Sequence, residues 1–464
     1  MRKRVKKLTG VLLAAALTFG GVGCGGGAAV SLEDLYIPTY NNDAHVRAMS
    51  GMAPNFSDRA QVETYKAAGF NFAPYAEDFF SAADVPVQGE NSLYLKGLKL
   101  LEEYGIDTFL QPHNSRYSLT PTNNPCYYEQ YFSDVDFRDY PAVKGFYVAD
   151  KSDYGQILDT EARYLSWFNE NYGGEGYAFY GNLFGCYTEN WRTGDYLNKT
   201  YEDYVEKFLS ALDKSQSANN YFGIDCYPLK EHDGTLSLGD TALGVHLDAA
   251  TRAKAHGAEL SAFVQVFGTM NDTSYRIPTT FAEIDWGLNN VLSFGARLIN
   301  FYCYREYKQD KFLGMLTEGV PNERYYFVQE AIANLRKWEH VYLSYTWEHI
   351  YTNVGTGSRL SVNPMFERVK DKEKPITDVK ALKSRYDVVL SEFSDGENNK
   401  AFLLTNYDEP TLQRNNKVTV TFEKAQGALY YRDGEPTTVL LDNGKFEVEL
   451  ESGEGVFVIP LYKK

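Results

Sequence analysis

The sequence has few of the side chains that most often bind transition metals. Its 464 residues include five cysteines and seven histidines, and none of them stand at a CxxC, HxH or HExxH spacing. Zinc sites need such clustered ligands, so the sequence predicts neither a metal site nor a cofactor. Cys226 and Cys303 fall inside predicted strands, and we expect them to be buried thiols in a core that does not need disulfide bonds.

Positive charge and long apolar runs are scarce as well. The 46 Lys and Arg residues are outnumbered by 62 Asp and Glu residues, and the formal net charge is −16. A surface this negative argues against nucleic acid as a partner. The apolar run at 11–19 is too short to span a bilayer core of about 30 Å.

The N-terminus has the order of a secretory signal. Five basic residues lie within positions 2–7, the apolar run follows, and small residues precede Cys24. This segment resembles the lipobox of bacterial lipoproteins, although Gly-Val at 21–22 replaces the usual Leu-Ser or Leu-Ala. The resemblance implies that the Cys24 thiol is diacylated and that several acyl chains anchor the protein stably. We therefore predict a lipoprotein signal peptide at 1–23, a Gly-rich tether at 24–44 and an extracytoplasmic, membrane-anchored protein. The alternative is an ordinary cleaved signal with an incidental cysteine.

Eight short apolar segments alternate with amphipathic helical segments from about residue 46. Helix-initiating residues such as Thr280 and terminal glycines such as Gly69 and Gly105 separate them. Strands that each precede a helix are expected to run parallel, and a count of eight favours a closed barrel over an open sheet. We therefore predict a (β/α)₈ TIM barrel at 45–350. Its strands are predicted at 47–54, 70–75, 107–113, 144–150, 177–184, 221–228, 260–268 and 296–304.

The helical periodicity disappears after about residue 380. About seven short segments then alternate apolar and polar residues, separated by turn clusters such as DGENN, RDGEP and DNGK. This pattern predicts an antiparallel β-sandwich at 381–464. The polar stretch at 351–380 is predicted to link the two domains.

The carboxyl ends of the strands carry the functional residues of this barrel fold, which selects the candidate binding residues. They are carboxylates, amides and aromatic side chains, and such a mouth suits a polyhydroxylated ligand. In the loop after the fifth strand, Trp191 is expected either to stack on a sugar ring or to pack its loop. In the loop after the seventh strand, Arg276 is expected to hold either the loop or a ligand carboxylate. The full set is Tyr75, Glu77, His113, Asn182, Trp191, Tyr227, Gln265, Arg276, Tyr302, Tyr304 and Glu306.

The segment PAVKGFYVADK at 141–151 resembles the fourth strand of a group of glycoside-hydrolase-like barrels in bacterial lipoproteins. That strand reads approximately Gly-Tyr-Tyr-hydrophobic-x-Asp-Glu-Pro. GIDCYP at 223–228 and the stretch from SYRIPTT to FYCY at 274–304 carry the most specific similarity, which extends over about residues 45–340. The resemblance implies hydrolysis of O-glycosidic bonds in an oligo- or polysaccharide. The chain departs from the pattern at Lys151 and Ser152, where the group has Glu and Pro.

Two carboxylates remain as catalytic candidates. Asp150 ends the fourth strand and Asp225 ends the sixth. Glycoside hydrolysis needs one group that protonates the leaving oxygen and a second that acts as nucleophile or base. Some α-glycosidase and α-galactosidase barrels place these groups on the same two strands, which is an analogy. We expect Lys151 to keep Asp150 ionised. Two interpretations stay open: a glycoside hydrolase, and a degenerate barrel that binds glycan without cleaving it.

Overall fold

The computed structural model describes residues 30–75, 92–110, 135–159, 164–185, 188, 190–192, 194–232, 235–238, 242–269, 275–306, 312–353 and 378–464. The predicted signal peptide, Cys24, Glu77 and His113 lie outside these ranges. Tyr75 ends a strand, but its side chain is also outside the described part.

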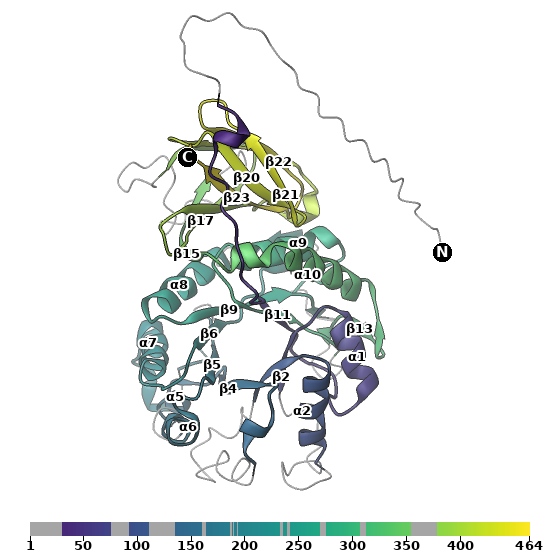
Figure 1. Ribbon diagram of the computed structural model, residues 1–464. Helices are drawn as coiled ribbons and strands as arrows, with labels where there is room; N and C mark the ends of the chain where they lie inside the picture. The colour runs from purple at the N-terminus through teal and green to yellow at the C-terminus, as the bar shows by residue number, and fades with distance from the viewer. Residues whose placement is uncertain are drawn as a thin grey trace, which may run out of the picture.

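Eight parallel strands form the barrel, which confirms the predicted TIM-barrel class (Figure 1). Each strand pairs with its neighbours in chain order, except that β1 and β2 meet at a seam. Asn71 bridges this seam, because its backbone N donates to Ala48 O at 3.3 Å and its side-chain Oδ1 accepts from Ala48 N at 2.8 Å. The strands are β1 (Arg47–Met49), β2 (Phe72–Tyr75), β3 (Asp107–Leu110), β4 (Val143–Asp150), β5 (Ala178–Leu183), β6 (Asn220–Ile224), β9 (Glu259–Gln265) and β11 (Leu298–Tyr302).

Helices surround the barrel, and α9 begins at the initiating residue that the sequence predicts. Thr280 caps α9 by accepting from Glu283 N, while Gly69 and Gly105 take positive φ angles after α1 and α2. The helices are α1 (Arg59–Ala67), α2 (Leu93–Glu103), α5 (Tyr154–Asp159), α6 (Leu165–Tyr172), α7 (Tyr201–Leu212), α8 (Ala242–Ala255), α9 (Phe281–Leu292) and α10 (Glu323–Tyr342). Two short hairpins lie in the loops, β7 (Leu229–His232) with β8 (Thr235–Leu238), and β13 (Leu316–Thr317) with β14 (Val320–Pro321). A further antiparallel pair, β10 (Gly268–Thr269) with β12 (Phe312–Leu313), joins the loop after β9 to the loop after β11.

Aromatic side chains fill the barrel interior on the amino-terminal side of the polar strand ends. The Arg47 guanidinium lies over the rings of Phe72, Phe109 and Tyr221 at 4.9–5.5 Å from their centroids. These rings belong to an interior cluster that also contains Met49, Tyr147, Ala178, Tyr180 and Leu298. The interior is therefore a packed core, and polar side chains gather above it at the carboxyl ends of the strands.

Two antiparallel sheets form the C-terminal domain. One apolar cluster receives side chains from both sheets, including Leu390 and Phe402 from one and Val420 and Phe446 from the other. The larger sheet has the order β15 (Thr346–Asn353), β17 (Val388–Ser394), β18 (Lys400–Asn406), β23 (Gly455–Leu461), β20 (Gly427–Arg432) and β21 (Glu435–Leu440). The smaller has the order β16 (Val379–Ser384), β19 (Asn416–Phe422) and β22 (Lys445–Leu450).

The C-terminal sheet begins earlier than the predicted boundary at residue 381. β15 pairs with β17 over its whole length, although 346–353 was assigned to the barrel and the linker. The reason is that α10 is followed directly by this strand, so no turn-rich segment marks the change of domain.

The central strands of the larger sheet, β17, β18 and β23, are buried on both faces. Val388 and Leu390 point into the sandwich, whereas Val389 and Phe393 belong to the same apolar cluster as the barrel helices. Phe457 packs against Trp338 of α10 with ring centroids 5.4 Å apart. The C-terminal domain lies next to α9 and α10 (Figure 1). The barrel and the C-terminal domain therefore share one continuous core.

The N-terminal segment runs along the C-terminal domain before it enters the barrel (Figure 1). Leu35 follows η1 (Leu32–Asp34) and forms a β-bridge with Lys463, and Tyr36 N donates to Tyr462 O at 2.9 Å. No helix among the described residues is long and apolar enough to cross a membrane.

Candidate active site

Asp150 and Asn182 lie side by side at the carboxyl ends of β4 and β5. They are register partners, and Asn182 Nδ2 donates to Asp150 Oδ1 at 3.2 Å. Asn182 is buried, and its Oδ1 has no hydrogen-bond partner among the described residues. A Cβ atom at Gly223 would lie 3.3 Å from this oxygen and 3.1 Å from Ser261 Cβ, so only a glycine fits closely beside the amide. A buried acceptor of this kind is suited to a water molecule or a ligand hydroxyl.

Asp225 follows β6 and is 1% exposed. Lys151 Nζ lies 2.7 Å from Asp225 Oδ2. Burial raises the pKa of Asp225, the Lys151 ammonium lowers it, and the charge of Asp150 raises it again. The contact between Lys151 and Asp225 was not predicted, since Lys151 was expected to act on its neighbour Asp150.

Tyr147 and Tyr180 form the base of the site. Their rings stack with centroids 4.5 Å apart. Burial raises the pKa of both phenols, and the charges of Asp150 and Asp225 both contribute to the increase. Both carboxylates therefore act electrostatically on the same pair of tyrosines, and the contact between Asp225 and Lys151, the neighbour of Asp150 in the chain, places them at one site.

The sequence analysis missed this pair of tyrosines. Tyr180 stands two residues before Asn182, so a period of two puts both on the inner face of β5. Tyr147 stands three residues before Asp150, an odd spacing that would put them on opposite faces. An irregularity in register between Tyr147 and Ala149 changes the alternation. Strand periodicity was a usable signal on β5 but a misleading one on β4.

Aromatic rings from the end of β11 and from the loops after β6 and β9 form one group. Tyr227 and Tyr302, both predicted, are half-buried with ring centroids 5.7 Å apart. Phe267 packs edge-on against Tyr227 at 4.8 Å, and Tyr275 lies 5.4 Å from Phe267. The last two residues were not predicted, because they belong to a loop whose path the sequence does not specify.

Trp191 and Tyr304 are packing residues. Trp191 is 2% exposed and stacks on Tyr204 with centroids 5.3 Å apart, so the loop-packing alternative is the correct one. Tyr304 is also buried, and its ring packs against Tyr65 of α1 at 5.2 Å. The prediction that Tyr304 lines the mouth is wrong, because this residue turns toward the helix layer after β11 ends.

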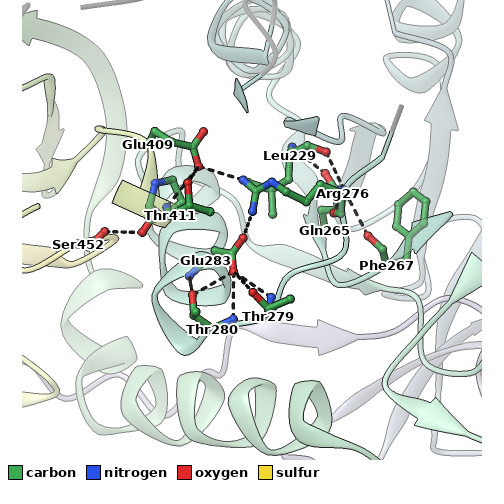
Figure 2. Close-up of polar contacts among 11 residues, drawn as sticks. Leu229, Gln265, Phe267, Arg276, Thr279, Thr280, Glu283, Glu409, Thr411 and Ser452 are labelled. Carbon is green, nitrogen blue, oxygen red and sulfur yellow. Dashed lines mark hydrogen bonds and ion pairs between the residues drawn. The ribbon is translucent and has the colours of Figure 1, made fainter. Parts of the chain in front are cut away.

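Gln265 and Arg276 hold the loops rather than a ligand (Figure 2). The Gln265 side chain accepts from Leu229 N at 2.8 Å and donates to Leu229 O and Arg276 O, both at 3.0 Å. The Arg276 guanidinium forms ion pairs with Glu283 and Glu409. Gln265 was predicted to hold a sugar hydroxyl, and this is wrong because its polar atoms are bound to the backbone.

The structure gives less support for the last candidate binding residue, Glu306. Glu306 is half-buried, and its Oε1 accepts from Glu318 N at 3.2 Å.

Cys226 and Cys303 are buried thiols, as predicted. Within the described ranges, no group of three His, Cys, Asp or Glu side chains is arranged to hold a metal ion.

Two solved structures with a similar fold are described as glycoside hydrolases. A family 5 glycoside hydrolase from Bacteroides vulgatus ATCC 8482 has a TM-score of 0.54 and 9% identity, with 94% of this chain and 92% of that chain covered. A second structure, described as a glycoside hydrolase, has a TM-score of 0.53 and 10% identity, with 93% and 96% covered. No protein-family model and no curated protein matches the sequence. The similarity therefore concerns the fold, over both the barrel and the C-terminal domain.

Proposed function

We propose that this protein hydrolyses an O-glycosidic bond of an oligo- or polysaccharide, with Asp150 and Asp225 as its two carboxylates. The observation that carries the proposal is their position at the carboxyl ends of β4 and β6, above the same pair of tyrosines. The fold shared with glycoside hydrolases supports it.

The surroundings of the two carboxyl groups suit different roles. The raised pKa of the buried Asp225 suits the general acid, which protonates the leaving glycosidic oxygen. Lys151 then stabilises the carboxylate that remains after proton transfer. Asp150, held by Asn182, acts on the anomeric carbon, either directly as nucleophile or through a water molecule. A separation of about 5 Å between carboxyl groups corresponds to retention of configuration, and roughly 6.5–9.5 Å to inversion.

A second candidate function is glycan binding without cleavage. Lys151 stands where the resembling barrels have Glu, and it forms an ion pair with Asp225. An ammonium group in place of a carboxyl group removes one possible proton donor from the mouth. In this alternative, the half-buried rings of Tyr227 and Tyr302 contact the sugar.

We also propose that Cys24 carries a lipid anchor that holds the protein on the outer side of the cell membrane. The basic segment, the apolar run and the small residues before Cys24 support this placement. Cys24→Ala is expected to move the protein from the membrane fraction to the soluble fraction. Membrane association that survives this change would contradict the anchor.

The test of function is hydrolysis of a broad panel of aryl glycosides and oligosaccharides by the chain from residue 25 onward. Asp150→Asn and Asp225→Asn are each expected to reduce kcat by about 100-fold or more, since each removes an acid or base group. Asp153→Asn is the matched control, because Asp153 binds the backbone of α5. Its activity should stay close to that of the parent.

Two other outcomes have clear meanings. Turnover that survives both changes at Asp150 and Asp225 would exclude these residues as the catalytic pair. Absence of turnover with saturable glycan binding would establish the degenerate barrel and make Lys151 the mark of lost catalysis.

A further inference from the structure

One buried amide ties together two loops at the mouth of the barrel. Gln265, the last residue of β9, binds both backbone groups of Leu229 and the carbonyl oxygen of Arg276 (Figure 2). Leu229 is four residues after Asp225 and two after Tyr227. Arg276 N also donates to Leu229 O at 3.2 Å. The loop that carries Asp225 is therefore fixed to the loop that follows β9.

The side chain of Arg276 connects this pair of loops to the C-terminal domain. One of its terminal nitrogens contacts Glu283 of α9, and the other lies 2.9 Å from Glu409 Oε1. Glu409 belongs to the C-terminal domain, where it caps η6 (Pro410–Leu412) and accepts from Thr411 Oγ1 at 3.0 Å. The contact between Arg276 and Glu409 thus crosses the boundary between the domains.

Burial makes this connection stiff. The Arg276 side chain is 6% exposed, that of Glu283 0% and that of Glu409 11%. Glu283 Oε2 accepts from the backbone and hydroxyl groups of Thr279 and Thr280, so the carboxylate cannot rotate without losing several bonds. Moving the loop would separate charges in a buried setting, where they interact far more strongly than in water.

We propose that the C-terminal domain positions the catalytic loop of the barrel, through the chain of contacts Glu409–Arg276–Gln265–Leu229. Gln265, Arg276 and Glu409 are positioning residues, and they act on Asp225 and Tyr227 without touching substrate. The coupling of Glu409 to the two loops is inferred from their contacts alone. The expected effect on catalysis rests on the proposed function.

Hydrogen–deuterium exchange of the chain from residue 25 onward tests this coupling directly. Glu409→Ala is expected to speed exchange in peptides covering 225–232 and 275–280 by roughly tenfold or more, since it removes a buried charge-assisted contact. Exchange in β17 and β18 should stay near that of the parent. Glu409→Gln keeps a side-chain acceptor and should restore much of the protection.

Asp408→Ala is the matched control. Asp408 neighbours Glu409 and pairs with Arg414 at 2.5 Å, an ion pair that stays within the C-terminal domain. Its replacement should leave exchange at 225–232 unchanged. Equal acceleration by Asp408→Ala and Glu409→Ala would overturn the proposal, and so would equal acceleration in β17 and β18, because Glu409 would then only stabilise its own domain.

Kinetics adds a second measurement that is separate from the exchange result. If the parent protein hydrolyses a glycoside, Glu409→Ala should lower kcat and leave KM nearly unchanged, because a displaced Asp225 affects the chemical step. Absence of hydrolysis by the parent would contradict the proposed function, while the exchange pattern would still decide the coupling.

Discussion

Lys151 and Asp225 form an ion pair at the candidate site, and their side chains differ in burial. Asp225 is almost fully buried, whereas Lys151 keeps about a third of its side chain exposed. Burying a carboxylate costs free energy that one ammonium group only partly offsets, which is why the pKa of Asp225 is raised overall. Such an arrangement is typical of a functional residue rather than a stabilising one.

Asp225→Asn should therefore abolish activity without lowering stability. In the parent protein, the raised pKa means that the ionised carboxylate opposes folding at neutral pH. The free energy of unfolding of the variant is expected to equal or exceed that of the parent above the folded-state pKa. This advantage should shrink as the pH falls toward the ordinary value of 3.8. Urea titrations at several pH values measure it, and a loss of stability at neutral pH would contradict the role given to burial.

His246 predicts a separate dependence on pH. It is buried in α8, its Nδ1 lies 3.3 Å from Asn290 Nδ2, and burial lowers its pKa from 6.5 to about 4. Between these values the unfolded chain binds a proton that the folded chain does not. Unfolding free energy should therefore fall by about 3 kcal/mol from pH 7 to pH 4 through this residue. His246→Gln should remove that part of the slope, and an unchanged slope would show that His246 does not cause it.

Among the elements, the N-terminal segment at 32–36 packs on the C-terminal domain, although the barrel lies between them in the sequence. Leu35 is buried, and Lys464 N donates to Asp34 O at 2.9 Å. A Cβ atom at Gly427 would lie 2.4 Å from Leu35 Cδ1, so a glycine in β20 makes room for this side chain. The segment at 32–36 is thus part of the C-terminal domain, although it precedes the barrel in the sequence.

Leu35→Ala should destabilise the protein by about 2–5 kcal/mol, the usual cost of truncating a buried leucine. Leu32, which is 41% exposed in the same segment, provides the control. Leu32→Ala should change the unfolding free energy by less than about 0.5 kcal/mol. Chemical denaturation of both variants measures the difference, and equal effects would mean that the segment is not docked in solution.

For the whole molecule, the larger C-terminal sheet is the common layer between the barrel helices and the smaller sheet. Trp286 of α9 packs against Tyr407, and Trp338 of α10 packs against Phe457. Asn289 Nδ2 also donates to Gly453 O at 3.1 Å. The central strands of this sheet are apolar on both faces. One face would be exposed to water if either the barrel or the smaller sheet unfolded alone.

We therefore expect the two domains to unfold in one cooperative transition. Four of the five tryptophans belong to the barrel and its helices, and the fifth, Trp347, lies in β15. Tryptophan fluorescence therefore reports mainly on the barrel, and it should give a denaturation curve that coincides with far-ultraviolet circular dichroism. Phe457→Ala should lower stability by about 3–5 kcal/mol and shift both curves together. Separate midpoints for the two probes would show that the shared core does not couple the domains.

The sequence by itself determined the class of the fold and the region of the site. Eight apolar segments followed by helical ones can bury their strands on both faces only in a parallel sheet, and capping residues such as Thr280 mark where helices begin. The rule that functional residues follow the strands then selected Asp150, Asn182 and Asp225, which the structure brings together.

Only the tertiary structure decided which of the selected side chains face the mouth. Trp191 follows β5 and Gln265 ends β9, yet Trp191 packs its loop and Gln265 binds backbone groups. The contact of Lys151 with Asp225 joins residues far apart in the chain. Local periodicity specifies the alternation of a regular strand, but the direction of a side chain beyond the strand end depends on bulges and loop paths. These are set by packing against other elements, which no single segment of sequence contains.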